Sequence, residues 1–196
     1  MARLEYFFDY VSPFSYLADT QIPALIERTG AELVYRPFFL GGAMQAAKNS
    51  PPMTVPNKGA YMMADIRRWA TRYGVEVNMN PHFPVNTLHA MRAAVAALDD
   101  ERFPDFHRAM FRSMWVTGQN LGDTEVLKAA IDDAGLDGAA IVARSKEQDV
   151  KDKLRQNTEE AVSRGAFGAP TLFVGEEMFW GNDRLDFVEE ALRAAS

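Results

Sequence analysis

The alternation of hydrophobic and polar positions predicts a strand, a helix and a second strand at the start of the chain. Residues 3–9 are largely apolar, as in a central strand that is covered on both faces. Residues 14–28 carry apolar side chains close to helical spacing, and Gly30 is a typical helix stop. Residues 31–37 then read as a strand. A unit of this length predicts two parallel strands joined by a helix.

The middle of the chain predicts helices and no strand. Residues 41–56 are rich in Gly, Pro and Asn, and they predict a loop long enough to suggest a functional role. Helical periodicity follows in several segments that are separated by Pro and Gly. These helices are expected at residues 58–73, 87–98, 103–115, 124–134, 138–144 and 148–164.

The last part of the chain returns to strands. Residues 171–174 and 178–180 flank Gly-Glu-Glu and predict a β-hairpin, and residues 183–195 predict a closing helix with one apolar face. The order of elements predicts an α/β fold in which a thioredoxin-like sheet contains an all-helical insertion. We expect residues 1–57 and 166–196 to form the thioredoxin-like domain, and residues 58–165 to form the insertion.

Composition narrows the class of protein. A length of 196 residues allows one well-buried core, and the net charge of −6 argues against nucleic-acid binding. The N-terminus lacks a signal-peptide pattern, and no segment approaches the ~20 apolar residues of a membrane span. We therefore expect a cytoplasmic protein. The three histidines lack metal-ligand spacing, and with no cysteine in the chain we expect no metal site.

The turn after the first strand is the most informative local feature. Ser12-Pro13-Phe14-Ser15 stands where a thioredoxin-type redox protein carries Cys-x-x-Cys. The N–H groups and dipole of the following helix favour a negative charge there, and redox enzymes use this place to lower a thiol pKa. Without cysteine, the chain cannot exchange disulfides itself. Ser12 can still stabilise a thiolate that is brought by a bound thiol, for which glutathione is the first candidate.

The segment before the third strand offers a second candidate. In a thioredoxin-like sheet, residues 165–171 would lie beside the first helix. Pro170 would then be cis, which would leave the backbone N–H and C=O of Ala169 exposed to an extended peptide. The same residues also suit an ordinary turn into a strand.

Other polar residues suit the charged ends of glutathione. Asn182 and Asp183 precede the last helix, where they can cap it, bind a carboxylate through N–H groups, or hold an ammonium group. Lys58 suits the glycine carboxylate, although a lysine at the start of a helix is often only solvated. Asn49 lies in the Pro-rich loop and offers an amide.

A set of segments in fixed order carries a family resemblance. The segments are FDYVSPFSYL (8–17), RPFFLGG (36–42), NSPP (49–52), PNKG (56–59), GAFGAPT (165–171) and WGNDRL (180–185). With them the chain resembles 2-hydroxychromene-2-carboxylate isomerases and kappa-class glutathione transferases, which are DsbA-like members of the thioredoxin superfamily. The resemblance covers nearly the whole chain.

The resemblance implies glutathione as cofactor and a homodimer. It implies that the Ser12 hydroxyl donates to the glutathione sulfur, and that Ala169, before cis-Pro170, pairs with the cysteinyl part. It also implies that Asn182 and Asp183 hold the γ-glutamyl part, and that Asn49 and Lys58 contact glutathione or the second substrate.

The resemblance implies an isomerase that interconverts 2-hydroxychromene-2-carboxylate and trans-o-hydroxybenzylidenepyruvate by reversible thiolate addition, in aromatic catabolism. A kappa-class transferase that conjugates glutathione to electrophiles is the alternative, and the segment 37–42 resembles the transferases more. The partner is then a small aromatic acid or an electrophile. A non-catalytic thioredoxin-like binding module is the third hypothesis.

Overall fold

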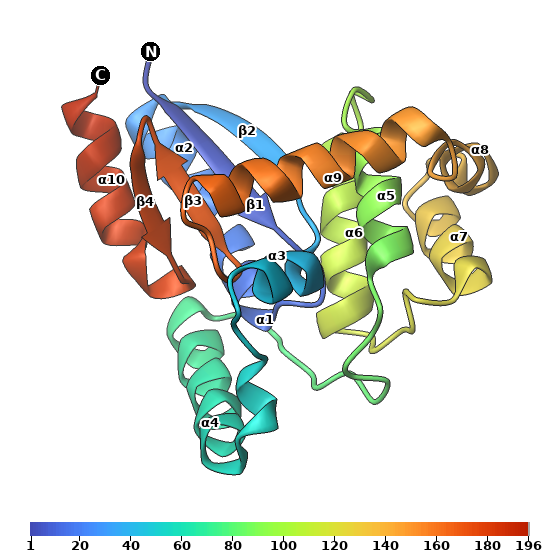
Figure 1. The fold of residues 1–196 in the computed structure, drawn as a ribbon, viewed down its shortest axis with the longest axis horizontal. Helices are drawn as coiled ribbons and strands as arrows, with labels where there is room; N and C mark the ends of the chain where they lie inside the picture. The colour runs from blue at the N-terminus through green and yellow to red at the C-terminus, as the bar shows by residue number, and fades with distance from the viewer. Residues whose placement is uncertain (196) are drawn as a thin grey trace.

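The computed structural model describes residues 1–195 and shows a central sheet flanked by helices (Figure 1). The N-terminal elements are β1 (Arg3–Phe8), α1 (Pro13–Asp19), α2 (Ile22–Thr29), β2 (Glu32–Pro37), α3 (Leu40–Ala46) and the short 3-10 helix η1 (Pro52–Thr54). The middle elements are α4 (Pro56–Tyr73), α5 (Leu88–Ala97), α6 (Phe103–Trp115), α7 (Thr124–Asp133), α8 (Gly138–Arg144) and α9 (Gln148–Ser163). The C-terminal elements are β3 (Thr171–Val174), β4 (Glu177–Trp180), η2 (Asn182–Arg184) and α10 (Leu185–Ala194).

The sheet has the strand order β2-β1-β3-β4. Strand β1 pairs in parallel with β2 and antiparallel with β3, which forms the predicted hairpin with β4. The predicted strand–helix–strand unit and the thioredoxin-like, DsbA-like fold are therefore confirmed. No strand lies between β2 and β3 in residues 1–195, and the helices α4 to α9 match the predicted ones to within two residues at each end.

Alternate residues of β1 face two hydrophobic clusters. Tyr6 and Phe8 belong to the larger cluster, which includes side chains of α6 and α10. Phe7 points to the opposite face, where its ring lies 6.0 Å from that of Phe38 and 5.6 Å from that of Phe173, measured between centroids. Helix α9 crosses this second face of the sheet (Figure 1). Strand β1 is thus covered on both sides, as its apolar sequence predicts.

The helices between β2 and β3 are spread over two regions. Helix α4 projects from one end of the molecule, while α5 to α8 lie beside the sheet (Figure 1). The base of α4 packs on α1, where Met62 and Ile66 contact Leu17 in a separate small cluster. The division of the chain into two domains stays a prediction.

The single helix predicted at residues 14–28 is wrong. The chain forms α1 and α2, separated at Thr20 and Gln21. Pro23 explains the break, because it has no N–H to donate to the carbonyl group of Asp19 and its ring would clash with that carbonyl. Pro23 instead lies in the first turn of α2, where its fixed φ is favourable.

The loop predicted at residues 41–56 is also partly wrong, since it contains α3 and η1. The sequence does not predict α3, because Gly41 and Gly42 lie in its first turn and glycine is a poor helix former. A tertiary contact fixes the start of the helix: the Leu40 N–H donates to Oδ2 of Asp9 at 2.9 Å.

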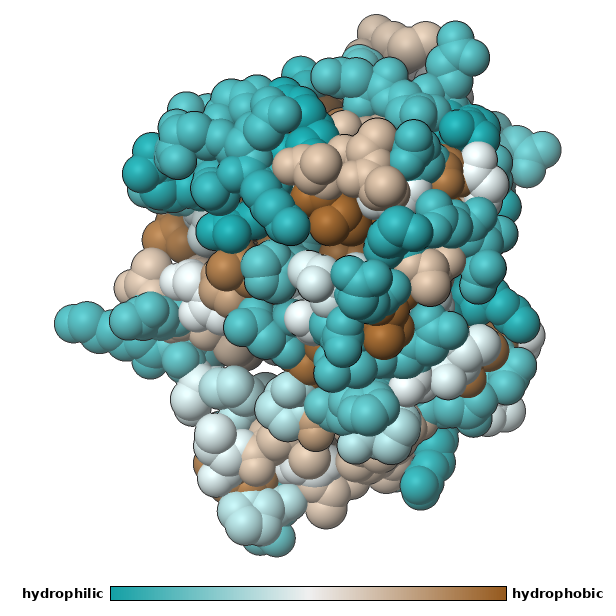
Figure 2. Space-filling model, turned by 90° about the vertical axis from the view of Figure 1, so that its right-hand side faces the viewer, coloured by the Kyte–Doolittle hydropathy of each residue, from teal (hydrophilic) through white to brown (hydrophobic). Residues whose placement is uncertain are grey.

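The helices expose mainly polar side chains to solvent. The face seen in Figure 2 is mostly hydrophilic, with hydrophobic surface in separate small areas. Among residues 1–195, we find no helix that is both long and apolar enough to cross a membrane.

Candidate active site

A cavity of ≈ 1120 Å³ opens at the C-terminal end of β1 and the N-terminal end of α1. It is bounded by the turn after β1, by α3 with the loop that follows it, by the start of α4, and by residues 83–87, 167–169 and 180–183. The predicted site residues that line it are Ser12, Asn49, Lys58, Ala169, Asn182 and Asp183. Pro170 does not line the cavity, but its bond to Ala169 is cis, as predicted. The structure thus brings the predicted residues together, while their roles stay predictions.

Ser12 is the N-cap of α1 and is almost fully buried. Its Oγ accepts the N–H of Ser15 at 3.1 Å, which satisfies one of the unpaired donors at the helix start. Its hydroxyl donates to the Ala169 carbonyl at 2.9 Å. Because a serine hydroxyl has one proton, Ser12 must turn away from Ala169 before it can donate to a ligand.

The start of α1 keeps one free backbone donor. The N–H groups of Ser15 and Tyr16 both bond to Ser12, and Pro13 has no N–H. The Phe14 N–H has no acceptor within residues 1–195, and Phe14 lines the cavity. A thiolate beside Ser12 would therefore meet the Phe14 N–H as a second donor, which the sequence alone does not reveal.

The second serine of the motif occupies a different environment. Ser15 is fully buried and does not line the cavity. Its hydroxyl oxygen has no hydrogen-bond partner among residues 1–195, whereas its carbonyl accepts the Tyr6 hydroxyl at 2.8 Å. The Ser12 hydroxyl can therefore reach a ligand in the cavity, whereas the Ser15 hydroxyl cannot.

The expectation that both backbone groups of Ala169 are free needs a correction. Its carbonyl already accepts the Ser12 hydroxyl, because the loop 165–171 packs directly against the start of α1. Its N–H has no acceptor within residues 1–195. Because a carbonyl oxygen has two lone pairs, the Ala169 carbonyl can still accept a ligand amide beside the Ser12 hydroxyl.

Asn182 and Asp183 lie at the far side of the cavity. Asn182 is buried, and its carbonyl accepts the Tyr73 hydroxyl at 2.9 Å, so that α4 is tied to this segment. The Asp183 carboxylate is half-exposed and pairs through Oδ2 with Arg184 at 2.6 Å. Gly181 has φ +102°, and a Cβ there would lie 2.5 Å from Oδ1 of Asp183. Only glycine therefore allows the carboxylate to take this position.

Asn49 and Lys58 come from opposite sides of the Pro-rich segment. The Asn49 side-chain amide donates to the Phe167 carbonyl at 2.9 Å, which leaves one of its two N–H groups for a ligand. Lys58 is exposed, and within residues 1–195 no carboxylate pairs with it. The ammonium group of Lys58 is therefore free to bind an anion.

Asp9 is a cavity residue that the sequence analysis missed. It is fully buried and accepts the N–H of Val11 at 3.0 Å, the N–H of Leu40 at 2.9 Å and the hydroxyl of Thr87 at 2.6 Å. Burial raises the pKa of Asp9, while these hydrogen bonds oppose the rise. Asp9 thus links three walls of the cavity, which are the turn after β1, the start of α3 and the segment 83–87. Its only sequence signal is a charged residue at the end of an apolar strand.

The remaining walls of the cavity are largely apolar. Trp180 packs against Phe167 with ring centroids 4.9 Å apart, and a Cβ on Gly168 would come within 2.5 Å of the indole nitrogen. The other apolar lining residues include Phe14, Met44, Met53, Met62, Phe83 and Val85. These side chains offer a hydrophobic surface to a second ligand beside the polar one.

The fold and the site together define a thioredoxin-type protein whose redox cysteines are replaced. Residues 3–193 match the family described as DSBA-like thioredoxin domain, and the chain belongs to this family.

Comparison with three known proteins shows which members of this family the chain is similar to. The chain is 36% identical over 191 residues to a 2-hydroxychromene-2-carboxylate isomerase of Sphingobium xenophagum, with 96% of this chain and 97% of the relative covered. It is 28% identical over 199 residues to glutathione S-transferase kappa 1 of Rattus norvegicus, covering 94% and 88%. A solved structure of 2-hydroxychromene-2-carboxylate isomerase aligns with a TM-score of 0.88 at 25% identity, covering 98% and 95%. The chain therefore belongs to the family of these isomerases and kappa-class transferases, and it is an enzyme.

Proposed function

We propose that the protein is a glutathione-dependent isomerase that interconverts 2-hydroxychromene-2-carboxylate and trans-o-hydroxybenzylidenepyruvate. The observation that carries the proposal is the position of the Ser12 hydroxyl, which lies at the wall of a large cavity next to the free Phe14 N–H. The isomerase relative at 36% identity over nearly the full chain supports it.

The donors and acceptors around the cavity fit the parts of glutathione. Ser12 and Phe14 offer an O–H and an N–H to the sulfur, and the Ala169 backbone suits the cysteinyl amide. The free ammonium group of Lys58 suits the glycine carboxylate, and the half-exposed carboxylate of Asp183 suits the amino group. When bound, glutathione supplies a nucleophilic thiolate whose reversible addition to the conjugated double bond allows that bond to rotate.

The contribution of Ser12 depends on an exchange of hydrogen bonds. A ligand N–H on the Ala169 carbonyl keeps that acceptor satisfied when the Ser12 hydroxyl leaves it. The Ser12 proton can then turn toward the sulfur, while Oγ continues to accept the Ser15 N–H. A hydrogen bond to the charged form lowers the thiol pKa and raises the thiolate fraction at neutral pH.

The apolar wall and a second lysine support an aromatic acid as the substrate. Met44, Met62 and Phe83 surround space beside Ser12 and would contact an aromatic ring while excluding water. Lys48 also lines the cavity, so a second ammonium group is available for the carboxylate of the substrate after Lys58 binds glutathione. Glutathione conjugation to a neutral electrophile would need no second cation.

A kappa-class transferase is the second candidate function. Kappa-class transferases align with this chain over nearly its whole length, and conjugation uses the same thiolate and the same Ser12. The test is the interconversion of 2-hydroxychromene-2-carboxylate with and without glutathione. Fast interconversion only with glutathione supports the isomerase, whereas conjugate formation without interconversion supports the transferase. The third hypothesis, a non-catalytic module, is at odds with a family of enzymes.

We further propose that the protein acts in the cytoplasm as a homodimer, in the breakdown of aromatic compounds. We also retain the division into a thioredoxin-like domain and a helical insertion at residues 58–165, which forms the acceptor side of the cavity.

A further inference from the structure

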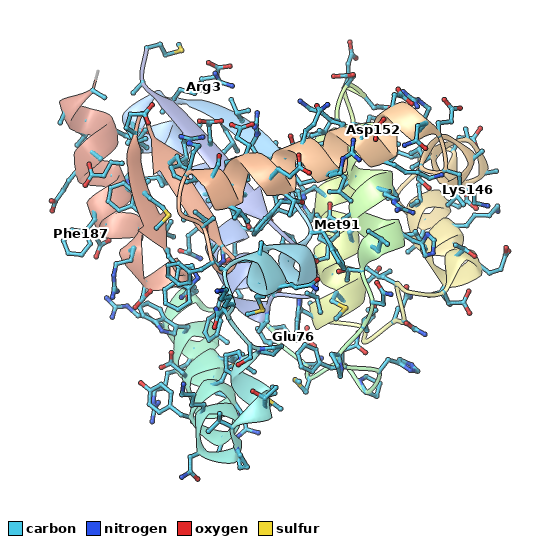
Figure 3. All side chains as sticks on the ribbon, viewed as in Figure 1. Arg3, Glu76, Met91, Lys146, Asp152 and Phe187 are labelled. Atoms are coloured by element: carbon cyan, nitrogen blue, oxygen red, sulfur yellow. The ribbon has the colours of Figure 1, made fainter. Side chains whose placement is uncertain are left out.

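A second cavity, of ≈ 440 Å³, lies between α3, α5 and α9. Among residues 1–195, Phe39 alone lines both this cavity and the larger one, so that it lies between them. In Figure 3, the labelled residue Met91 lies on α5 and the labelled residue Asp152 lies on α9. The size is in the range of small-molecule sites, which is about 300–1,000 Å³. None of the proposed glutathione contacts lines this second cavity.

Arg92 is an unmatched cation in this cavity. It is partly buried, and its Nε–H is fully buried and finds no acceptor in the part of the chain that the structure describes. No carboxylate within residues 1–195 pairs with its guanidinium. A buried, charged donor that lacks a partner loses its hydration with nothing in return. Most arginines of the described chain form an ion pair with a carboxylate, whereas Arg92 does not.

The neighbouring cations on α9 differ in their partners. Arg155 pairs with Asp152 at 3.0 Å and approaches Glu159 at 3.9 Å. Lys151 also lines the cavity, but no carboxylate in the described chain pairs with it. Two positive groups, Arg92 and Lys151, therefore face one cavity from opposite helices, and neither forms an ion pair within residues 1–195. The one carboxylate among the lining residues, Glu159, lies 3.9 Å from Arg155.

The rest of the lining sets the shape of the ligand. Leu88, Leu154 and Val162 contribute aliphatic side chains, and Phe39 contributes the face or edge of a ring. A planar carboxylate matches the fork geometry of a guanidinium, and an apolar body matches these walls. We propose that the second cavity binds a small hydrophobic carboxylate of about the size of benzoate. Its anionic end lies on Arg92 and Lys151, and its ring lies against Phe39 and Leu154.

The proposal is tested by titrating the full-length protein with para-trifluoromethylbenzoate, followed by fluorine NMR. We expect saturable binding to the wild type. Arg92→Gln should weaken it at least about tenfold, since a hydrogen bond to a charged group contributes roughly 1.5–3 kcal/mol. Arg155→Gln is the matched control at the same cavity and should change the affinity less than about twofold. Lys48→Gln, which changes the cation that we assign to the substrate carboxylate in the larger cavity, should leave the binding intact.

Several outcomes would overturn the proposal. They are the absence of saturable binding, equal binding to Arg92→Gln and the wild type, and loss of binding in Lys48→Gln. Circular dichroism checks that each variant is folded. If Arg92→Gln does not fold, Ala46→Phe replaces it, because Ala46 is an exposed residue of the cavity rim whose enlargement fills the space. Unchanged binding to Ala46→Phe would also contradict the site.

Discussion

Replacement of Ser12 by alanine removes the group that we assign to the thiolate. The side chain that is lost accepts the Ser15 N–H at 3.1 Å and donates to the Ala169 carbonyl at 2.9 Å. The first bond caps α1, so the substitution should lower the free energy of unfolding by about 1 kcal/mol, within the 0.5–2 kcal/mol range for N-caps. The cavity and its other contacts remain, and we expect glutathione affinity to stay within about tenfold.

The effect on the thiol follows from the hydrogen-bond exchange. A bond from Ser12 to a thiolate contributes roughly 1.5–3 kcal/mol, and the neutral bond to Ala169 that it replaces contributes about 0.5–1.5 kcal/mol. The midpoints of these two ranges differ by about 1 kcal/mol. Since ~1.4 kcal/mol corresponds to one pKa unit, Ser12→Ala should raise the pKa of the bound thiol by about one unit.

The assay is the ultraviolet absorbance of the thiolate, recorded against pH for glutathione bound to each variant. Ser15→Ala is the matched control, because its hydroxyl is buried, unpaired and away from the cavity. It should leave the thiol pKa unchanged and should not lower the stability through a lost hydrogen bond. Equal thiol pKa values in the wild type and in Ser12→Ala would refute the assigned role, as would a comparable rise in Ser15→Ala.

The remaining predictions concern charges. Asp183→Asn should weaken glutathione binding, measured by calorimetry, but should not weaken binding of the analogue that lacks the amino group. Lys58→Gln should weaken glutathione several-fold, but not the analogue that lacks the glycine unit. The hydrogen bond from Arg28 is the main cause that lowers the pKa of Glu189 to about 2, below its unfolded value. Glu189 therefore stabilises the fold above pH ~4.5, and this contribution is lost as the pH falls toward ~2. In denaturation curves, Glu189→Gln should be less stable than the wild type near neutral pH and equal to it at low pH, whereas Glu190→Gln should match the wild type throughout.

Each of these predictions has a contrary result. If Asp183→Asn lost as much affinity for the deaminated analogue as for glutathione, Asp183 would not act through the amino group. If Lys58→Gln lost as much affinity for the analogue without the glycine unit as for glutathione, Lys58 would not bind the glycine carboxylate. A stability difference for Glu189→Gln that persists at low pH would show that its ion pair is not the cause.

Local rules predicted the sheet and much of the site. The apolar run of β1, the stop at Gly30 and the hairpin around Gly175 depend on nearby residues, and all are found where the sequence indicates them. The site residues could be named because short segments resemble a family whose fold brings such segments together. The resemblance supplied the long-range arrangement that periodicity alone does not contain.

The missed features depend on contacts between distant segments. The start of α3 is fixed by Asp9, far away in the sequence, and no local pattern announces this contact. The free donor at Phe14 appears only when every N–H of α1 is followed to its acceptor. The occupied carbonyl of Ala169 likewise requires the packing of its loop on Ser12. Sequence patterns identify candidate groups, but the partners decide what those groups can do.

The most direct test of the account is the absorbance change of purified 2-hydroxychromene-2-carboxylate with the enzyme, measured with and without glutathione. We predict rapid equilibration with trans-o-hydroxybenzylidenepyruvate only when glutathione is present, with no glutathione consumed. The rate should fall in Ser12→Ala and persist in Ser15→Ala. No acceleration in the presence of glutathione, or equal acceleration in its absence, would contradict the proposed function.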